Sequence, residues 1–83
     1  MKSDNILIQN IDKVHTTVMG VVRIKRKLGL VADDAVAWCK SQILCADEII
    51  RKGKNWYVYK GDTVITVNAH SFTIITAHKN SGN

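Results

Sequence analysis

The chain of 83 residues lacks proline, internal repeats and low-complexity segments, and it has only two cysteines. Cys39 and Cys45 lie six residues apart, and no further ligands at metal spacing accompany them, so a zinc site is not expected. Without a visible secretory signal, two such cysteines are typical of reduced thiols in a cytosolic protein. The start, MKSDNILIQN, has no long apolar segment, and no apolar run approaches the ~20 residues that cross a bilayer. We expect a cytoplasmic protein that uses no membrane, metal or cofactor.

Acidic residues are few compared with basic ones. The chain has 12 Lys and Arg against 7 Asp and Glu, which gives a formal net charge of +5. This balance favours an anionic partner, with nucleic acid first and a membrane surface or an acidic protein second. The apolar content of 46% is typical of a globular chain, and the length predicts a single domain, residues 1–83, with a small core.

The first part of the chain predicts helices, over about residues 4–44. Ser3 or Asp4 can cap a first helix, and His15 lies at its expected end. A third helix is predicted to begin at Asp33 or Asp34. The apolar residues of these two helices recur at helical spacing. They are Leu7, Ile11 and Val14 in the first, and Val36, Cys39 and Ile43 in the third.

The helix between them is the most basic stretch of the chain. Thr16-Thr17 offers its N-cap, and Gly29 is suited to its C-terminus because glycine adopts the left-handed conformation without strain. Arg23, Arg26 and Lys27 fall on one side of this helix, opposite its apolar stripe. This basic side is either a solvated surface or a surface that contacts phosphates.

The strictest pattern, at 54–79, predicts three β-strands, and the sheet as a whole extends over about 47–79. Residues 47–52 are either a further helical turn or a short edge strand. Two-residue turns at Gly61-Asp62 and Ala69-His70 are assumed, and they determine which residues pair. One face of the sheet is then apolar and faces the core. Its two rows are Val58, Ile65, Ile74 and Trp56, Val67, Phe72.

The predicted fold is therefore α+β, with two to three N-terminal helices packed on one face of a C-terminal three- to four-stranded antiparallel β-meander. On the opposite face, Tyr57 pairs with Thr66 and Thr73, while Tyr59 pairs with Val64 and Ile75. That face is either an ordinary solvated surface or a platform that stacks bases or binds a protein.

The core face is predicted to have a polar rim. Beyond Ile74, the same side of the last strand continues to Thr76 and His78. The helices could deliver His15 and Arg23 to this rim. Local hydrogen bonding of Thr76 and solvent exposure of His78 are the alternative explanation.

Two resemblances follow from these motifs. The segments GKNWY, ITVN and TIITAH resemble those of a family of short uncharacterised bacterial proteins, over nearly the whole chain. An early His15, the basic segment VVRIKRKLGL with Arg23, and Thr76 in the last strand are similar to small proteins of the barnase, RelE and colicin ribonuclease superfamily. The arginine pattern departs from that superfamily, and His78 stands where its members often have an aromatic or aliphatic residue.

The second resemblance implies metal-independent RNA cleavage by a toxin or mobile-element protein, or an RNA-binding relative that has lost catalysis. His15 or His78 would act as acid or base, since histidine titrates nearest neutrality. Arg23, with Lys25 or Arg26 behind it, would hold the phosphate, and Thr76 would orient it. The residues expected to bind RNA are Arg23, Lys25, Arg26, Lys27, Tyr57 and Tyr59.

Two other classes of function remain open. Three helices followed by a hairpin is the order of a winged helix-turn-helix DNA-binding protein, although Asp33 and Asp34 at the start of the third helix would repel phosphates. The alternative is a protein-binding module, either an inhibitor from a phage or a homodimer joined through Tyr57, Tyr59 and Ile75.

Overall fold

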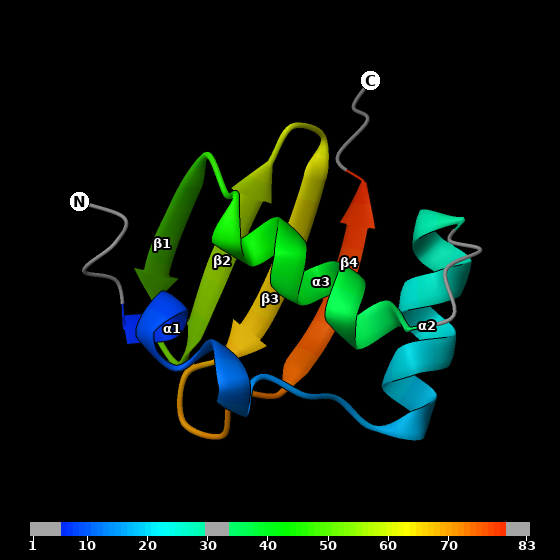
Figure 1. Ribbon diagram of the computed structural model, residues 1–83, viewed down its shortest axis with the longest axis horizontal. Helices are drawn as coiled ribbons and strands as arrows, with labels where there is room; N and C mark the ends of the chain where they lie inside the picture. The colour runs from blue at the N-terminus through cyan, green and yellow to red at the C-terminus, as the bar shows by residue number, and fades with distance from the viewer. Residues whose placement is uncertain (1–5, 30–33, 80–83) are drawn as a thin grey trace.

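The computed structural model describes residues 6–29 and 34–79 and has three α-helices followed by a four-stranded antiparallel sheet in these ranges (Figure 1). The strands are hydrogen-bonded in the order β1-β2-β3-β4. Helices α1 and α3 lie over one face of the sheet, and α2 runs beside β4 (Figure 1). This arrangement confirms the predicted fold class. The elements are α1 (Ile6–Gln9), the 3₁₀ turn η2 (Ile11–Lys13), α2 (Val18–Leu28), α3 (Ala35–Leu44), β1 (Glu48–Lys52), β2 (Asn55–Lys60), β3 (Thr63–Asn68) and β4 (Ile74–Lys79).

The ends of α2 and α3 are capped by residues that the sequence predicts. The side chain of Thr17 accepts a hydrogen bond of 3.0 Å from the Gly20 amide, which satisfies one of the free donors at the start of α2. Gly29 ends α2 in the left-handed conformation, with φ of 63°. Asp34 caps α3 by accepting from Ala37 at 3.0 Å. The alternative cap Asp33 lies outside the described residues.

The first helix is shorter than predicted. It ends at Gln9, and the chain continues through η2 to Val14. Asn10 explains the interruption, because its side-chain Nδ2 donates to the Ile6 carbonyl at 2.9 Å and so competes with continued helix. The candidate caps Ser3 and Asp4 lie outside the described residues.

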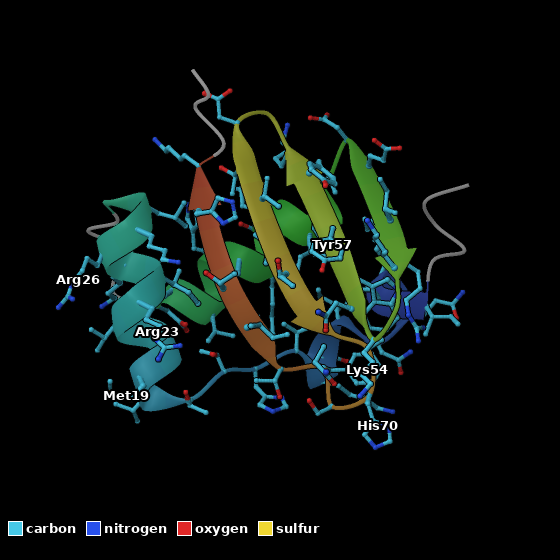
Figure 2. The ribbon with its side chains drawn as sticks, turned by 180° about the vertical axis from the view of Figure 1, so that it is seen from behind. Met19, Arg23, Arg26, Lys54, Tyr57 and His70 are labelled. Atoms are coloured by element: carbon cyan, nitrogen blue, oxygen red, sulfur yellow. The ribbon has the colours of Figure 1, made fainter. Side chains whose placement is uncertain are left out.

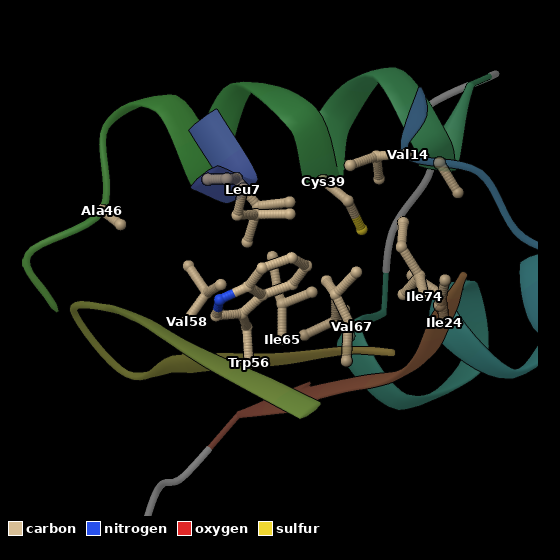
Figure 3. Packing of buried hydrophobic residues seen from close by; sticks show 14 residues of the cluster. Leu7, Val14, Ile24, Cys39, Ala46, Trp56, Val58, Ile65, Val67 and Ile74 are labelled. Carbon is tan, nitrogen blue, oxygen red and sulfur yellow. The ribbon is translucent and has the colours of Figure 1, made fainter. Parts of the chain in front are cut away.

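The core lies between α1, α3 and the inner face of the sheet, and α2 closes it beside β4 (Figure 3). Trp38 is half-buried against it. Burying one large aliphatic side chain contributes about 1.5–3 kcal/mol, so the apolar residues hold these elements together. The largest fully buried side chains are Leu7, Ile24, Cys39, Ile43, Val58, Ile65, Val67 and Ile74.

Pairing between the first three strands follows the predicted pattern. Val58 lies opposite Ile65, and Trp56 lies opposite Val67. Gly61 has a φ of 56° in the two-residue turn between β2 and β3, where glycine accepts this conformation without strain. Residues 48–52 form the edge strand β1, which decides the question that the sequence left open for 47–52.

Pairing between β3 and β4 differs from the prediction, and the two-residue turn at Ala69-His70 is wrong. Asn68 organises a longer loop, because its Oδ1 accepts hydrogen bonds of 2.9 Å from the amides of both His70 and Ser71. Phe72 closes the loop with a φ of 60°. It still packs on Trp56, with ring centroids 5.4 Å apart, but it stands before β4 rather than in it.

The longer loop changes the face on which the end of β4 lies. Ile74 pairs with Val67, and Thr76 pairs with Thr66, so Ile75 is the extra residue of a β-bulge. Thr76 and His78 are therefore not on the rim of the core face, as predicted, but on the opposite face of the sheet. A shift in pairing by one residue is sufficient to cause this change, because side chains alternate between faces.

Candidate functional site

Figure 2 shows Tyr57 on the face of the sheet turned away from α3. Tyr59 lies on the same face, because it is two residues later in β2 and side chains of a strand alternate between faces. Tyr57 lies in one row with Thr66 and Thr76, and Tyr59 lies in the next row with Val64 and His78. The longer β3–β4 loop thus places two predicted catalytic residues beside two predicted RNA-binding residues. We call this surface the tyrosine face. It consists of Tyr57, Tyr59, Val64, Thr66, Thr76 and His78.

The centre of the tyrosine face is nearly closed to water, although none of the described helices lies over it (Figure 2). Val64 and Thr66, on β3, are each only 7% exposed. Their cross-strand neighbours are the larger Tyr57 and Tyr59 on one side and Thr76 and His78 on the other. The two tyrosine rings therefore rise beside a row of smaller side chains on β3, and they offer aromatic surface on this face.

Helix α2 adds positive charge along the β4 edge of this face. Lys27 reaches the face directly, since its Nζ donates to the Thr76 hydroxyl at 3.3 Å. Arg23 is one turn earlier on the same side of α2, because residues four apart are neighbours on a helix. Figure 2 shows Arg26 pointing away from the sheet. Lys25 is two residues from both Arg23 and Lys27, about 200° around the helix, and so lies on the other side of α2.

His15 is separated from the tyrosine face. It forms an isolated β-bridge with Thr73, just before β4, whereas His78 lies five residues further along, roughly 15 Å at the rise of a strand. Of the four predicted catalytic residues, the structure brings Thr76 and His78 onto one face, with Arg23 on the helix that borders it. The catalytic role of these residues stays a prediction.

The imidazole of His15 is held by hydrogen bonds at both nitrogens. Its Nδ1 donates to the Lys13 carbonyl at 2.7 Å, and this fixes the tautomer, so Nε2 accepts from the Thr73 hydroxyl at 3.2 Å. The Thr73 hydroxyl in turn lies 2.7 Å from that of Ser71. These bonds join η2 to the β3–β4 loop, so they give His15 a structural role in holding that loop.

The two cysteines lie in different environments. Cys39 is fully buried in α3, and desolvation raises the pKa of its thiol to about 12, so it stays protonated and unreactive. Cys45 is exposed. Within 6–29 and 34–79, no three His, Cys, Asp or Glu side chains are grouped to hold a metal ion. None of the helices in these ranges is long and apolar enough to cross a membrane.

A basic pocket at one end of the sheet was not predicted from the sequence. It has a volume of about 500 Å³. Two turns form it, the β1–β2 turn and the β3–β4 loop (Figure 2). The sequence did contain a signal for this pocket, namely the basic and amide residues of the segments RKGK and NAH at the two turns. Alternate turns of an antiparallel meander lie at the same end of the sheet, so these two segments could have been expected to meet. Its lining residues are Arg51, Lys54, Asn68, Ala69 and His70.

The fold and this surface define a small α+β protein with an open aromatic face bordered by a basic helix. Residues 8–78 match the family described as protein of unknown function (DUF3781), and the chain belongs to this family. This confirms the resemblance to a small uncharacterised family. No curated protein and no solved structure matches the chain significantly, so the resemblance to the barnase, RelE and colicin ribonucleases is not confirmed.

Proposed function

We propose that the protein binds single-stranded RNA across the tyrosine face. The single observation that carries this proposal is the row Tyr57–Thr66–Thr76, which joins an aromatic ring on an uncovered sheet face to the Lys27 ammonium at its edge. Unpaired bases stack on aromatic rings of open sheets, whereas a duplex keeps its base faces internal. The ligand is therefore a single strand rather than a helix.

Charge supports the same ligand. Lys27 and Arg23 lie along one edge of the face, where they would contact the phosphates of a strand whose bases reach Tyr57 and Tyr59. The net charge of +5 adds long-range attraction for a polyanion. Glu48, in the row of Tyr59, adds negative charge on the far side, at β1. We infer that the strand backbone follows the α2 side of the face.

The experiment compares two lysines on the same helix. Lys27→Gln and Lys25→Gln remove the same charge from opposite sides of α2. We expect Lys27→Gln to weaken binding of a fluorescein-labelled single-stranded RNA about fivefold to tenfold and to lower the slope of log K against log salt by about 1. Lys25→Gln, the matched control, should change both much less. Fluorescence anisotropy at several salt concentrations measures both quantities.

Stacking is tested separately from charge. Tyr57→Leu retains apolar bulk but removes the ring, and we expect a loss of affinity of about 1–3 kcal/mol without a change in the salt slope. Equal effects of the two lysine variants, together with wild-type affinity in Tyr57→Leu, would contradict RNA binding at this face. Equal affinity for a duplex and a single strand would also contradict it.

Metal-independent RNA cleavage remains a further proposal, based on the second resemblance. His78 and Thr76, near Lys27, are the residues whose positions support it best. His15 is not near His78, so an acid–base pair made of these two histidines has no geometric support. Protein binding is supported by the exposed apolar side chains Val18 and Met19 at the start of α2, which are 81% and 63% exposed.

A further inference from the structure

We infer that the pocket between the β1–β2 turn and the β3–β4 loop is a binding site for a phosphate monoester, separate from the tyrosine face. Its lining includes two basic side chains, Arg51 and Lys54, and the imidazole of His70, and among the described residues no carboxylate lines it. A phosphate monoester carries a charge of about −1.5 to −2 at neutral pH and three strong acceptor oxygens. The pocket therefore offers donors and positive charge where such a ligand needs both.

Arg51 is held in place for this role. Its Nε donates to the Gly53 carbonyl at 3.0 Å, and its guanidinium lies 5.6 Å from the centroid of the Trp56 ring. One of the five guanidinium N–H donors is used in this way, and the terminal nitrogens carry the other four. A guanidinium that is already ordered loses little conformational entropy when it binds a phosphate in a bidentate manner.

Asn68 contributes an oriented amide. Its Oδ1 accepts from the amides of His70 and Ser71, both at 2.9 Å, so the position of the oxygen follows from its hydrogen bonds. The Nδ2 group must then lie on the other side of the amide, where it can donate to a ligand. The same bonds hold the loop that carries His70, so the imidazole is positioned by the residue beside it.

Lys54 supplies charge from the turn between β1 and β2. It follows Gly53 in this two-residue turn, and its carbonyl accepts from the Ala69 amide at 2.7 Å. That bond ties the two walls of the pocket together. Figure 2 shows Lys54 and His70 at the same end of the sheet, away from Arg23 on α2.

The size of the pocket indicates more than inorganic phosphate. About 500 Å³ lies within the range of small-molecule sites, about 300–1,000 Å³. It leaves room for the group esterified to the phosphate. Two sources share this chemistry, a free mononucleotide and the 5′-phosphate at the end of a nucleic-acid strand.

The test uses the full chain and calorimetric titration with 5′-AMP, with adenosine as the uncharged control. We expect 5′-AMP to bind and adenosine not to bind. Lys54→Gln should weaken 5′-AMP binding about tenfold, whereas Lys52→Gln, which removes the same charge from the neighbouring strand end but does not line the pocket, should change it less than twofold. Arg51→Lys keeps the charge but loses the bidentate fork, and it should weaken binding as well.

A second arm compares 5′-phosphorylated and 5′-hydroxyl forms of one short RNA. Tighter binding of the phosphorylated form, lost in Lys54→Gln, identifies the strand end as the source, and binding of 5′-AMP alone identifies a free nucleotide. Either result supports the pocket as a phosphate site. This holds even if the 5′-hydroxyl RNA does not bind and the proposal of RNA binding at the tyrosine face is refuted. The inference is overturned if 5′-AMP and adenosine bind equally, or if Lys54→Gln and Lys52→Gln have equal effects.

Discussion

Cys39 shows how one buried side chain couples the stability of this small domain to pH. The thiol is fully buried, and desolvation raises its pKa from 9.0 to about 12. The native chain therefore keeps the thiol proton in a range of pH where the unfolded chain loses it. Stability that depends on the neutral thiol is fully present below pH 9 and is lost as pH rises toward 12.

We expect the free energy of unfolding to fall by up to about 1.4 kcal/mol per pH unit above pH 9 on account of Cys39. Urea unfolding at pH 8, 9 and 10 measures this slope. Cys39→Ala should have a shallower slope than the wild type over the same range, although it is less stable at pH 8 because it leaves a small cavity. Cys45→Ala, at an exposed position, should keep the wild-type slope. If all three chains have the same slope, burial of Cys39 does not govern it.

At the scale of elements, the contact between α2 and β4 decides where the basic residues lie. Thr16 fastens the start of α2 to the sheet, because its hydroxyl donates to the Ile74 carbonyl at 2.9 Å. Gly20 allows this approach, since a Cβ added there would collide with the Thr16 hydroxyl. The absence of a side chain at Gly20 is therefore a packing requirement, although φ at this residue is helical.

Gly20→Ala tests this requirement, because helix propensity and packing have opposite effects on the stability of this variant. Alanine favours a helix by about 1 kcal/mol over glycine, but overpacking costs about 1–3 kcal/mol. We expect a net loss of stability of about 1 kcal/mol, measured from the urea midpoint. In the Thr16→Ala background, the same change should cost less or stabilise the protein. A stabilising effect of Gly20→Ala in the wild-type background would show that α2 is not held closely by Thr16.

At the scale of the whole molecule, one small core connects every helix to the sheet. The buried cluster includes residues from α1 to β4, among them Leu7 and Ala77. An 83-residue domain has a net stability of only about 4–12 kcal/mol, so one core residue represents a large part of it. Residues of the tyrosine face lie outside this cluster, and their substitution should cost less.

Ile65→Ala and Ile50→Ala make this comparison with the same chemical change. Ile65 is 0% exposed at the centre of the sheet, and Ile50 is 40% exposed on the edge strand β1. We expect Ile65→Ala to cost about 2–5 kcal/mol and Ile50→Ala less than 1 kcal/mol. Chemical denaturation measures both. Similar costs at the two positions would contradict a single core on the α3 side of the sheet.

Local rules were sufficient for much of the architecture. The caps at Thr17, Gly29 and Asp34 depend on bonds between residues three or four apart in the sequence. Pairing of β2 with β3 follows from the short turn at Gly61 and from the apolar alternation of both strands. The position of both tyrosines on the face opposite the core was predicted for the same reason, because the alternation of side chains within β2 is sufficient to determine it.

Only the tertiary structure decided the position of Thr76 and His78 and the existence of the basic pocket. The side chain of Asn68 lengthens the β3–β4 loop, and the bulge at Ile75 shifts the pairing of everything after it. One extra residue in a strand moves every later side chain to the other face of the sheet. The local pattern of apolar and polar residues therefore does not determine the face on which residues after the bulge lie. The pocket likewise depends on two turns that are distant in sequence and meet only when the sheet has formed.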